Sequence, residues 1–248
     1  PAVAIIKHTN PCGLAVDQYL SLAFKKAMEG DPVSAYGGIV ASNRQIDQET
    51  AELIKETFFE CVIAPGYEEN ALKSLQTKKN LRILKIDPEN FLSFGVDYKY
   101  LPFGLLCQQA DIKPDDTNSF FSASSRKPSD NEQEDLLFAW KVVKHVKSNA
   151  IVFVKSKQLI GVGAGQMSRV DSVKLAARKA KDLGQDLNGA VMASDAFFPF
   201  RDGIDEAAGY GITAVIQPGG SIRDEEVLKA VDEQKMAMIL TKIRHFKH

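Results

Sequence analysis

The sequence predicts an α/β protein made of two tandem three-layer α/β/α sandwiches. Short apolar runs alternate with amphipathic segments in both halves, a rhythm typical of β-α-β units and of a mostly parallel sheet. Between the halves, residues 111–133 are rich in Ser, Asp, Asn, Lys and Pro, as is typical of a connector. We therefore expect a first subdomain over 1–110, that connector, and a second subdomain over 134–248.

The first half is expected to contain strands over 2–6, 38–41, 61–64 and 81–86 and helices over 21–29, 48–59 and 68–78. Gly30-Asp31-Pro32 stops the first helix, Asp47 is a suitable N-cap for the second, and Pro65-Gly66 closes the third strand. Because the chain opens on an apolar core strand, we expect an upstream segment to be missing from this subdomain.

The second half is expected to repeat the rhythm. Its predicted helices cover 134–145, 171–182, 205–210 and 224–233, and its predicted strands cover 150–155, 159–163, 190–194, 214–217 and 236–241. Pro218-Gly219-Gly220 ends the fourth of these strands. The last strand delivers Arg244 and the residues after it to the end of the sequence.

Composition is that of an ordinary globular protein and excludes several classes. Hydrophobic residues make up 44% and charged residues 25%, with 31 Lys and Arg against 32 Asp and Glu. No polybasic block points to nucleic acid, and no apolar run reaches the roughly 18 residues of a membrane helix. Nothing resembles a signal peptide, so we expect a cytoplasmic protein. Cys12, Cys61 and Cys107 are too few and too scattered for a disulfide framework.

The first candidate site is the Lys7-His8 pair that ends the first apolar run. Ligands of α/β sheets bind at the carboxyl ends of strands, and histidine is the side chain whose unperturbed pKa lies nearest neutrality. His8 is therefore a candidate general base, with Lys7 as a cation beside developing negative charge. The alternative is a surface lysine followed by a turn histidine.

The segment His8 to Gly13 also invites comparison with zinc deaminases. Those enzymes join a His-x-Glu segment to a later Pro-Cys-x-x-Cys. Here Asn10 stands where Glu is needed, and no second cysteine follows Pro11-Cys12. The ligand set is incomplete, so we expect no zinc site and no other metal.

Four further polar segments are candidate ligand-binding sites. Gly37 and Gly38 follow an aromatic residue, which suits either close approach of backbone to a ligand or a tight turn. Asn149 could hold an amide or formyl group, or form an Asx turn. Arg169 follows a glycine-rich loop that matches the dinucleotide fingerprint incompletely, but a helix N-terminus there would suit an anion. Residues 194–203 combine three Phe with an Arg-Asp pair, as in a pocket wall or a buried loop.

Taken together, these segments resemble the formyltransferase part of the bifunctional purine-biosynthesis enzymes, the family that joins AICAR transformylase to IMP cyclohydrolase. The matching stretches run through nearly the whole chain in order and are longest over 138–151 and 192–204. Within this family, the sequence resembles the bacterial enzymes. The cyclohydrolase domain, and an Arg-Tyr-Gly segment that helps to hold the nucleotide phosphate, have no counterpart in this sequence.

The resemblance implies a cytidine-deaminase-like fold without zinc, used twice in tandem. It implies transfer of a formyl group from 10-formyltetrahydrofolate to the 5-amino group of AICAR, giving FAICAR for IMP biosynthesis. His8 would accept the proton, Lys7 would stabilise the transition state and Asn149 would orient the formyl or carboxamide group. Positions matching nucleotide contacts are Gly37, Glu60, Lys79, Arg169, Phe197 and Arg244. Positions matching folate contacts are Val170, Asp202, Ser221 and Ile222.

The same resemblance implies a homodimer with sites at the interface, and it leaves a monovalent cation possible. Two other functions stay open. The chain could be a non-catalytic fragment that binds nucleotide or folate without turnover, because part of the phosphate site is absent. It could also be a zinc deaminase of related fold, which a metal analysis would decide.

Overall fold

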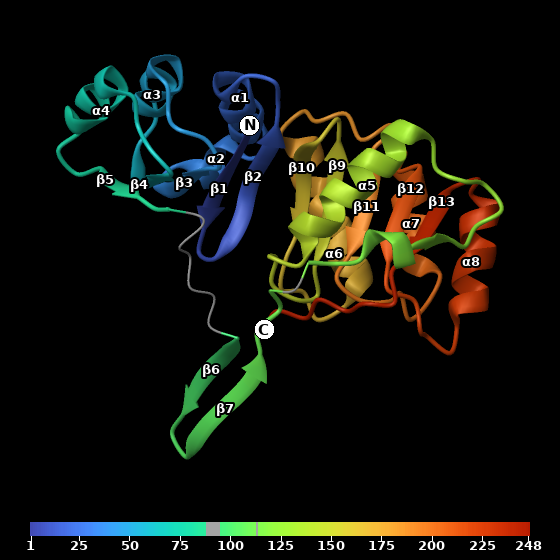
Figure 1. Ribbon diagram of the computed structural model, residues 1–248. Coiled ribbons are helices and arrows are strands. Elements are labelled where there is room, and N and C mark those ends of the chain that lie inside the picture. Colours follow the sequence, from blue (N-terminus) through green and yellow to red (C-terminus); the bar gives the residue numbers. More distant parts are fainter. Residues whose placement is uncertain (88–94, 113) are drawn as a thin grey trace.

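The computed structural model describes residues 1–87, 95–112 and 114–248 and has an α/β architecture (Figure 1). The strands are β1 (Ala2–Lys7), β2 (Asn10–Val16), β3 (Gly38–Ser42), β4 (Phe59–Ala64), β5 (Arg82–Lys85), β6 (Val96–Leu101), β7 (Gly104–Gln109), β8 (Phe121–Ser122), β9 (Ile151–Lys155), β10 (Gln158–Gly163), β11 (Val191–Ser194), β12 (Ala214–Gln217) and β13 (Ala237–Leu240). The α-helices are α1 (Leu20–Gly30), α2 (Pro32–Ala35), α3 (Gln48–Lys55), α4 (Glu69–Gln76), α5 (Asp130–Val143), α6 (Arg169–Asp182), α7 (Asp202–Gly209) and α8 (Asp224–Glu233), with a short 3₁₀ turn η2 (Thr117–Ser119).

Within the described residues, eleven strands form one continuous sheet in the order β5-β4-β3-β1-β2-β10-β9-β11-β12-β13-β8. The two halves join where β2 meets β10, through the antiparallel pair Ala15 and Gln158. The sheet is mixed, so the expectation of a mostly parallel sheet is wrong. Parallel pairing is confined to β3-β4-β5 in the first half and β11-β12-β13 in the second.

The same strand topology occurs in both halves. The first half has the order β2-β1-β3-β4-β5, and the second has β10-β9-β11-β12-β13. In each, the opening hairpin is antiparallel, its first strand also pairs antiparallel with the third, and the last three strands are parallel. The tight turns match as well, since His8 and Thr9 in one hairpin and Ser156 and Lys157 in the other all have positive φ.

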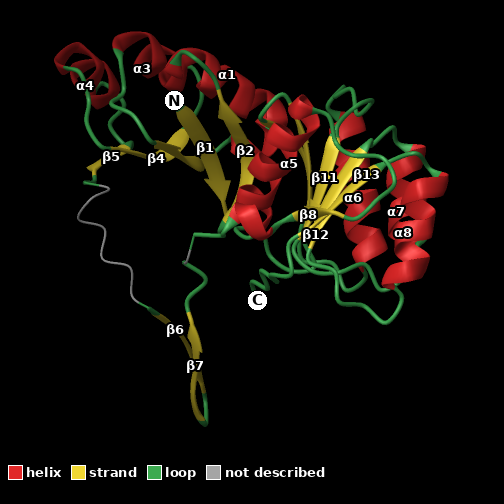
Figure 2. Ribbon diagram, turned by 45° about the vertical axis from the view of Figure 1, so that its right-hand side comes forward, coloured by secondary structure: helices red, strands yellow, loops and turns green. Residues whose placement is uncertain are grey.

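Helices cover the two faces of this sheet unequally. In the first half, α1, α3 and α4 pack on one face, around a core that includes Val3, Ile5 and Val40. In the second half, α6, α7 and α8 pack on the face that carries Phe153. Its neighbour Val152 points to the opposite face, where α5 covers it. Figure 2 shows α5 lying apart from the row formed by α6, α7 and α8.

Most predicted elements are present, and the structure adds the strand β2, which the sequence did not predict. No strand was expected over these residues, because Pro11 and Gly13 usually interrupt strands. The structure shows why glycine is needed in this strand: a Cβ on Gly13 would lie 1.9 Å from the carbonyl oxygen of Ala27 in α1. The helix predicted over 48–59 is also too long, because it ends at Lys55 and Phe59 already opens β4.

The hairpin β6-β7 is a further element that the sequence did not predict. It forms a separate two-stranded sheet that projects away from the large one (Figures 1 and 2). Its apolar side chains are exposed, Tyr100 by 85% and Phe103 by 88%. An isolated two-stranded hairpin is marginally stable in water, so a partner is expected to hold it. Residue 113 of the predicted connector lies outside the described residues.

Candidate functional site

The predicted site residues gather along one edge of the large sheet. Strand directions fix this edge: β1, β10, β11, β12 and β13 end there, whereas β2, β3, β4, β5 and β9 begin there. Each residue that the sequence singled out lies on a loop at this edge or within two residues of an element end there. The loops of the second half that follow parallel strands are where α/β sheets bind ligands.

The β1-β2 turn places Lys7 and His8 at this edge. Both turn residues are left-handed, with φ 49° at His8 and 64° at Thr9, as a two-residue hairpin turn requires. His8 is exposed. The Lys7 ammonium donates to the carbonyl of Tyr36, and a Cβ on Gly37 would lie only 3.2 Å from Lys7 Nζ. Gly37 therefore leaves the space that the Lys7 head group occupies.

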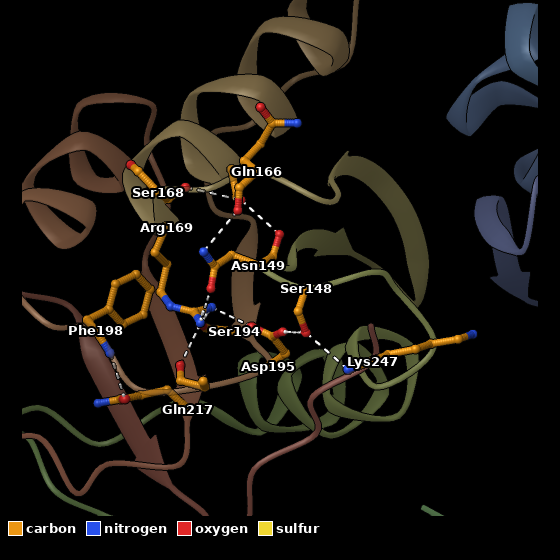
Figure 3. A network of polar contacts seen from close by, with 12 residues as sticks. Ser148, Asn149, Gln166, Ser168, Arg169, Ser194, Asp195, Phe198, Gln217 and Lys247 are labelled. Carbon is orange, nitrogen blue, oxygen red and sulfur yellow. Dashed lines mark hydrogen bonds and ion pairs between the residues drawn. The ribbon is translucent and has the colours of Figure 1, made fainter. Parts of the chain in front are cut away.

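A buried polar network surrounds Asn149 in the second half (Figure 3). The Arg169 guanidinium is 7% exposed and donates to Asp195, to Ser194 Oγ at 2.7 Å and to Asn149 Oδ1 at 2.9 Å. Asp195 is fully buried and also accepts from Ser148 Oγ at 2.5 Å. Because Arg169 is itself held by Asp195 and Ser194, its bond to Oδ1 fixes the Asn149 side chain at the amide oxygen.

The amide nitrogen of Asn149 is engaged too. It donates to the carbonyls of Gln166 and Met167 at 2.9 and 3.1 Å, in the loop that leads into α6. Because an amide oxygen has two lone pairs and Arg169 uses one, Oδ1 keeps one acceptor position for a ligand. The Asn149 amide is thus held in one orientation, in which Oδ1 can still accept one hydrogen bond from a substrate.

The two halves are bonded to each other beside this network. Asn10 Oδ1, in the strand after the Lys7-His8 turn, accepts from the backbone N–H of Lys147 at 2.9 Å. The last residues of the sequence also run through here, since Lys247 and Ser148 exchange hydrogen bonds of 2.9 and 3.0 Å. Arg244, just before, is exposed and stacks 5.5 Å from the ring centre of Phe246.

The remaining nucleotide-site predictions occupy two places. Glu60 and Lys79 are exposed on the first half and line a hollow of about 440 Å³ together with Arg82, which bonds Glu60 at 2.5 Å. Phe197 is half-buried in the loop after β11. The network around Asn149 comes from the second half, so the structure does not place Glu60 and Lys79 among its members.

The predicted folate positions lie on the second half. Val170 is half-buried in the first turn of α6. Asp202 begins α7, and its carboxylate accepts from the N–H of Gly203 at 2.8 Å. Ser221 and Ile222 lie in the loop between β12 and α8, where Ile222 is fully exposed. An exposed isoleucine next to a glycine-rich loop offers an apolar contact for a flat ligand.

A cavity of about 270 Å³ lies beside the Lys7-His8 turn, and its lining includes Lys7, His8, Cys12, Asp31 and Lys179. Asp31 bonds Lys179 at 2.6 Å across the two halves. Burial by itself would raise the pKa of the Asp31 carboxyl, but the Lys179 ammonium and Ser34 hold that pKa below its usual value. Burial raises the pKa of the Cys12 thiol to about 11, so this cysteine is a poor nucleophile.

No metal-binding group of three or more His, Cys, Asp or Glu side chains occurs among the residues that the structure describes. Likewise, none of the helices in the described ranges is both long and apolar enough to span a membrane.

Sequence reasoning missed several residues that build this site. They are Asn10, Asp31, Ser148, Lys179 and Asp195. Asp195 could have been identified from the sequence, because a carboxylate directly after an apolar strand is expected to be buried beside a partner of opposite charge. The others act through contacts between residues far apart in the chain, such as the Asn10-Lys147 bond, and the sequence gives no pattern for these.

Comparison with known proteins identifies the family. The family model for the AICARFT/IMPCHase bienzyme matches residues 1–179. The chain belongs to this family. Over its whole length it is 53% identical to the bifunctional purine biosynthesis protein PurH of Chlorobium phaeobacteroides and 49% identical to that of Persephonella marina. It is 54% identical to the PurH of Aquifex aeolicus over 99% of its length.

This membership confirms the resemblance seen in the sequence. The chain spans about half the length of the curated relatives it matches, 47% of the Chlorobium and Aquifex proteins and 48% of the Persephonella protein. The names of these relatives describe bifunctional proteins of purine biosynthesis.

Proposed function

We propose that this protein transfers a formyl group from 10-formyltetrahydrofolate to the 5-amino group of AICAR, giving FAICAR for IMP synthesis. The observation that carries the proposal is the meeting of the two halves at one sheet edge. There the Lys7-His8 turn of the first half is bonded through Asn10 to the segment that holds Asn149. Transfer between two substrates requires groups from both sides to converge within about 3–3.5 Å of the reacting atoms.

The proposed chemistry follows from the weakness of the nucleophile. The lone pair of the AICAR amine is delocalised into its ring, so the proton must leave as the amine nitrogen bonds the formyl carbon. His8 accepts that proton, and the Lys7 ammonium stabilises the oxyanion that the formyl oxygen becomes. When the tetrahedral intermediate collapses, the bond from carbon to N10 of the folate breaks, and the folate nitrogen takes up a proton. Asn149 orients the formyl or carboxamide group from its fixed position.

The nucleotide and the folate are proposed to occupy different loops of this edge. Residues proposed to contact AICAR are Gly37, Glu60, Lys79, Arg169, Phe197 and Arg244. Residues proposed to contact the folate are Val170, Asp202, Ser221 and Ile222. All of them lie at the edge that carries Lys7 and Asn149, which supports a single extended site. The proposal involves no zinc and leaves a monovalent cation possible.

We further propose that each half is a cytidine-deaminase-like α/β/α unit, with boundaries at 1–110 and 134–248 around the connector 111–133. The repeated strand order supports this. The role in purine biosynthesis for which the relatives are named supports small-molecule partners and a cytoplasmic location, and no nucleic acid or membrane partner is proposed.

A formyl-transfer assay on the purified chain, run beside AICAR binding, tests the proposal. The Lys7→Met variant is expected to turn over about 10²–10³ times more slowly, because it loses a fixed cation at the oxyanion. Loss of AICAR affinity alone would make Lys7 a binding residue. A wild-type chain that binds AICAR without turnover would favour the non-catalytic alternative, and stoichiometric zinc in a metal analysis would favour the deaminase.

The protein is also proposed to act as a homodimer with sites at the interface, and the exposed hairpin β6-β7 offers a contact for the second copy. Where a site takes His8 from one copy and Asn149 from the other, mixing inactive His8→Asn and Asn149→Ala chains is expected to restore partial activity, since some hybrid dimers then carry one site with both groups intact. The assay is formyl transfer after subunit exchange has been verified by mass. Verified exchange with no recovered activity would place each site within one chain.

A further inference from the structure

The position of the Lys7 ammonium depends on the short helix α2, which lies between α1 and β3. Its hydrogen-bond acceptor is the carbonyl of Tyr36, the residue at which α2 ends. The next residue, Gly37, has φ 71° and lies against Lys7 Nζ. A helix of four residues is not stable by itself, so other contacts must hold α2 in place. The contacts that hold α2 therefore also place the Lys7 head group.

Asp31 holds α2 at its N-terminal end. Its carboxylate accepts from the backbone N–H of Ser34 at 2.9 Å and from Ser34 Oγ at 2.6 Å, and so caps the helix. Asp31 is only 6% exposed, and burying a carboxylate is costly unless a cation is paired with it. That cation is Lys179, whose Nζ lies 2.6 Å from Asp31 Oδ2. Lys179 belongs to the last turn of α6, so the cap of α2 is completed by the second half of the protein.

The second half holds the junction of α1 and α2 at other points too. The last turn of α1 has the sequence Ala-Met-Glu-Gly, and the side chains that bond its terminal carbonyls come from the second half. Gln158 donates to the carbonyl of Lys26 at 2.9 Å. Gln185 donates to the carbonyl of Glu29 at 2.7 Å. The backbones are close here, since a Cβ on Gly30 would lie 2.6 Å from a carbonyl oxygen of β10. The second half therefore determines where α2 begins.

The helix α6 connects this junction to Asn149. Arg169, in its first turn, donates to Asn149 Oδ1 at 2.9 Å. Lys179 follows ten positions later, which is about 15 Å along the helix axis. One helix therefore holds the amide of the second half at one end, and the segment that places Lys7 at the other.

We propose that Lys179 is a positioning residue for formyl transfer that acts on Lys7 through Asp31 and α2, an inference that rests on the role proposed above for Lys7. Lys179 holds the Asp31 carboxylate, Asp31 holds the start of α2, and the carbonyl at the end of α2 holds the Lys7 ammonium. A cation stabilises an oxyanion best when it is fixed before the reaction begins. Loss of Lys179 is therefore expected to misplace Lys7 and to slow turnover, without removing a group that binds AICAR.

Steady-state formyl transfer is the first measurement. Lys179→Met keeps an unbranched side chain and removes the charge, and it is expected to lower kcat by about 10- to 100-fold. The KM for AICAR is expected to change by less than about twofold. Lys179→Arg keeps a cation that can pair with Asp31 and is expected to restore most of kcat. In a Lys7→Met background, Lys179→Met is expected to cost nothing further, because the group that it positions is already gone.

Lys155→Met is the matched control. Lys155 pairs with Asp186 at 2.7 Å and its side chain is 36% exposed, against 39% for Lys179. This pair lies within the second half, at the end of β9 that is remote from the site edge. The control is expected to keep normal kcat, because it loses a similar ion pair that has no connection to α2.

Lysine acylation is the second measurement and does not depend on activity. Brief treatment with acetic anhydride, followed by peptide mass spectrometry, gives the acylation rate of Lys7 relative to that of Lys73, whose side chain is 66% exposed on α4. An ammonium bonded to a carbonyl must leave that partner before it reacts. Lys179→Met is therefore expected to raise the relative rate of Lys7 about threefold or more, and Lys155→Met is expected to leave it unchanged.

Several results would overturn the positioning role. They are an unchanged relative rate of Lys7 in Lys179→Met, a normal kcat of that variant in an active protein, a raised KM for AICAR with kcat unchanged, and an undiminished loss in the Lys7→Met background. If the wild-type protein transfers no formyl group while Lys179→Met still raises the relative rate of Lys7, the positioning of Lys7 is confirmed and the proposed formyl transfer is wrong.

Discussion

The His8→Asn variant is expected to turn over about 10²–10⁴ times more slowly than the wild-type protein, with AICAR affinity nearly unchanged. The imidazole is proposed to act only while the amine attacks, so its loss raises the barrier without weakening ground-state binding. Asparagine is the replacement of choice because His8 has φ 49°, a conformation that asparagine tolerates better than alanine. The measurement is steady-state formyl transfer beside AICAR titration.

Ser156→Asn is the matched control for this variant. Ser156 has φ 52° in the corresponding turn of the second half, but that turn lies at the opposite edge of the sheet. The control is expected to keep normal turnover. A His8→Asn protein with near-normal turnover would remove His8 from the mechanism, and equal losses in both variants would indicate a general effect on the turns.

The Arg169→Met variant is expected to lower the free energy of unfolding by about 3–5 kcal/mol. Asp195 is fully buried, and removing the guanidinium leaves its carboxylate without a cation in a site that excludes water. Asn149 would also lose the donor at 2.9 Å that fixes its oxygen. Chemical denaturation followed by circular dichroism measures the change, and a loss below about 1 kcal/mol would show that the pair is not needed for stability.

Two companion variants sharpen this measurement. Arg223→Met removes the same side chain from an exposed pair, with Arg223 55% and Glu226 39% exposed, and is expected to cost less than about 1 kcal/mol. The double variant Arg169→Met/Asp195→Asn removes the buried charge together with its partner, and is expected to be more stable than Arg169→Met alone. A double variant no more stable than the single one would assign the loss to packing of the arginine stem.

The elements that were predicted well are those whose signals are local. Gly30-Asp31-Pro32 ends α1 where the sequence indicated, and Asp47 caps α3 through a 2.7 Å bond to the N–H of Thr50. β2 was missed because the glycine that looked like a breaker is required by the approach of α1. The hairpin β6-β7 was missed although Val96, Tyr98 and Tyr100 alternate with Asp97 and Lys99, and in the described part of the chain its strands are almost wholly exposed.

For the site, the sequence by itself determined which residue types stand at the ends of which strands, and the family resemblance attached roles to them. Periodicity and turn chemistry act over a few residues, so they placed Lys7, His8 and Asn149 next to strands correctly. Only the tertiary structure decided that the two halves share one continuous sheet, and that Asn10 bonds Lys147 across it. It also decided that Arg169 is buried against Asp195. These contacts join residues up to 137 positions apart, and they depend on strand pairing and burial of charge, which no local pattern encodes.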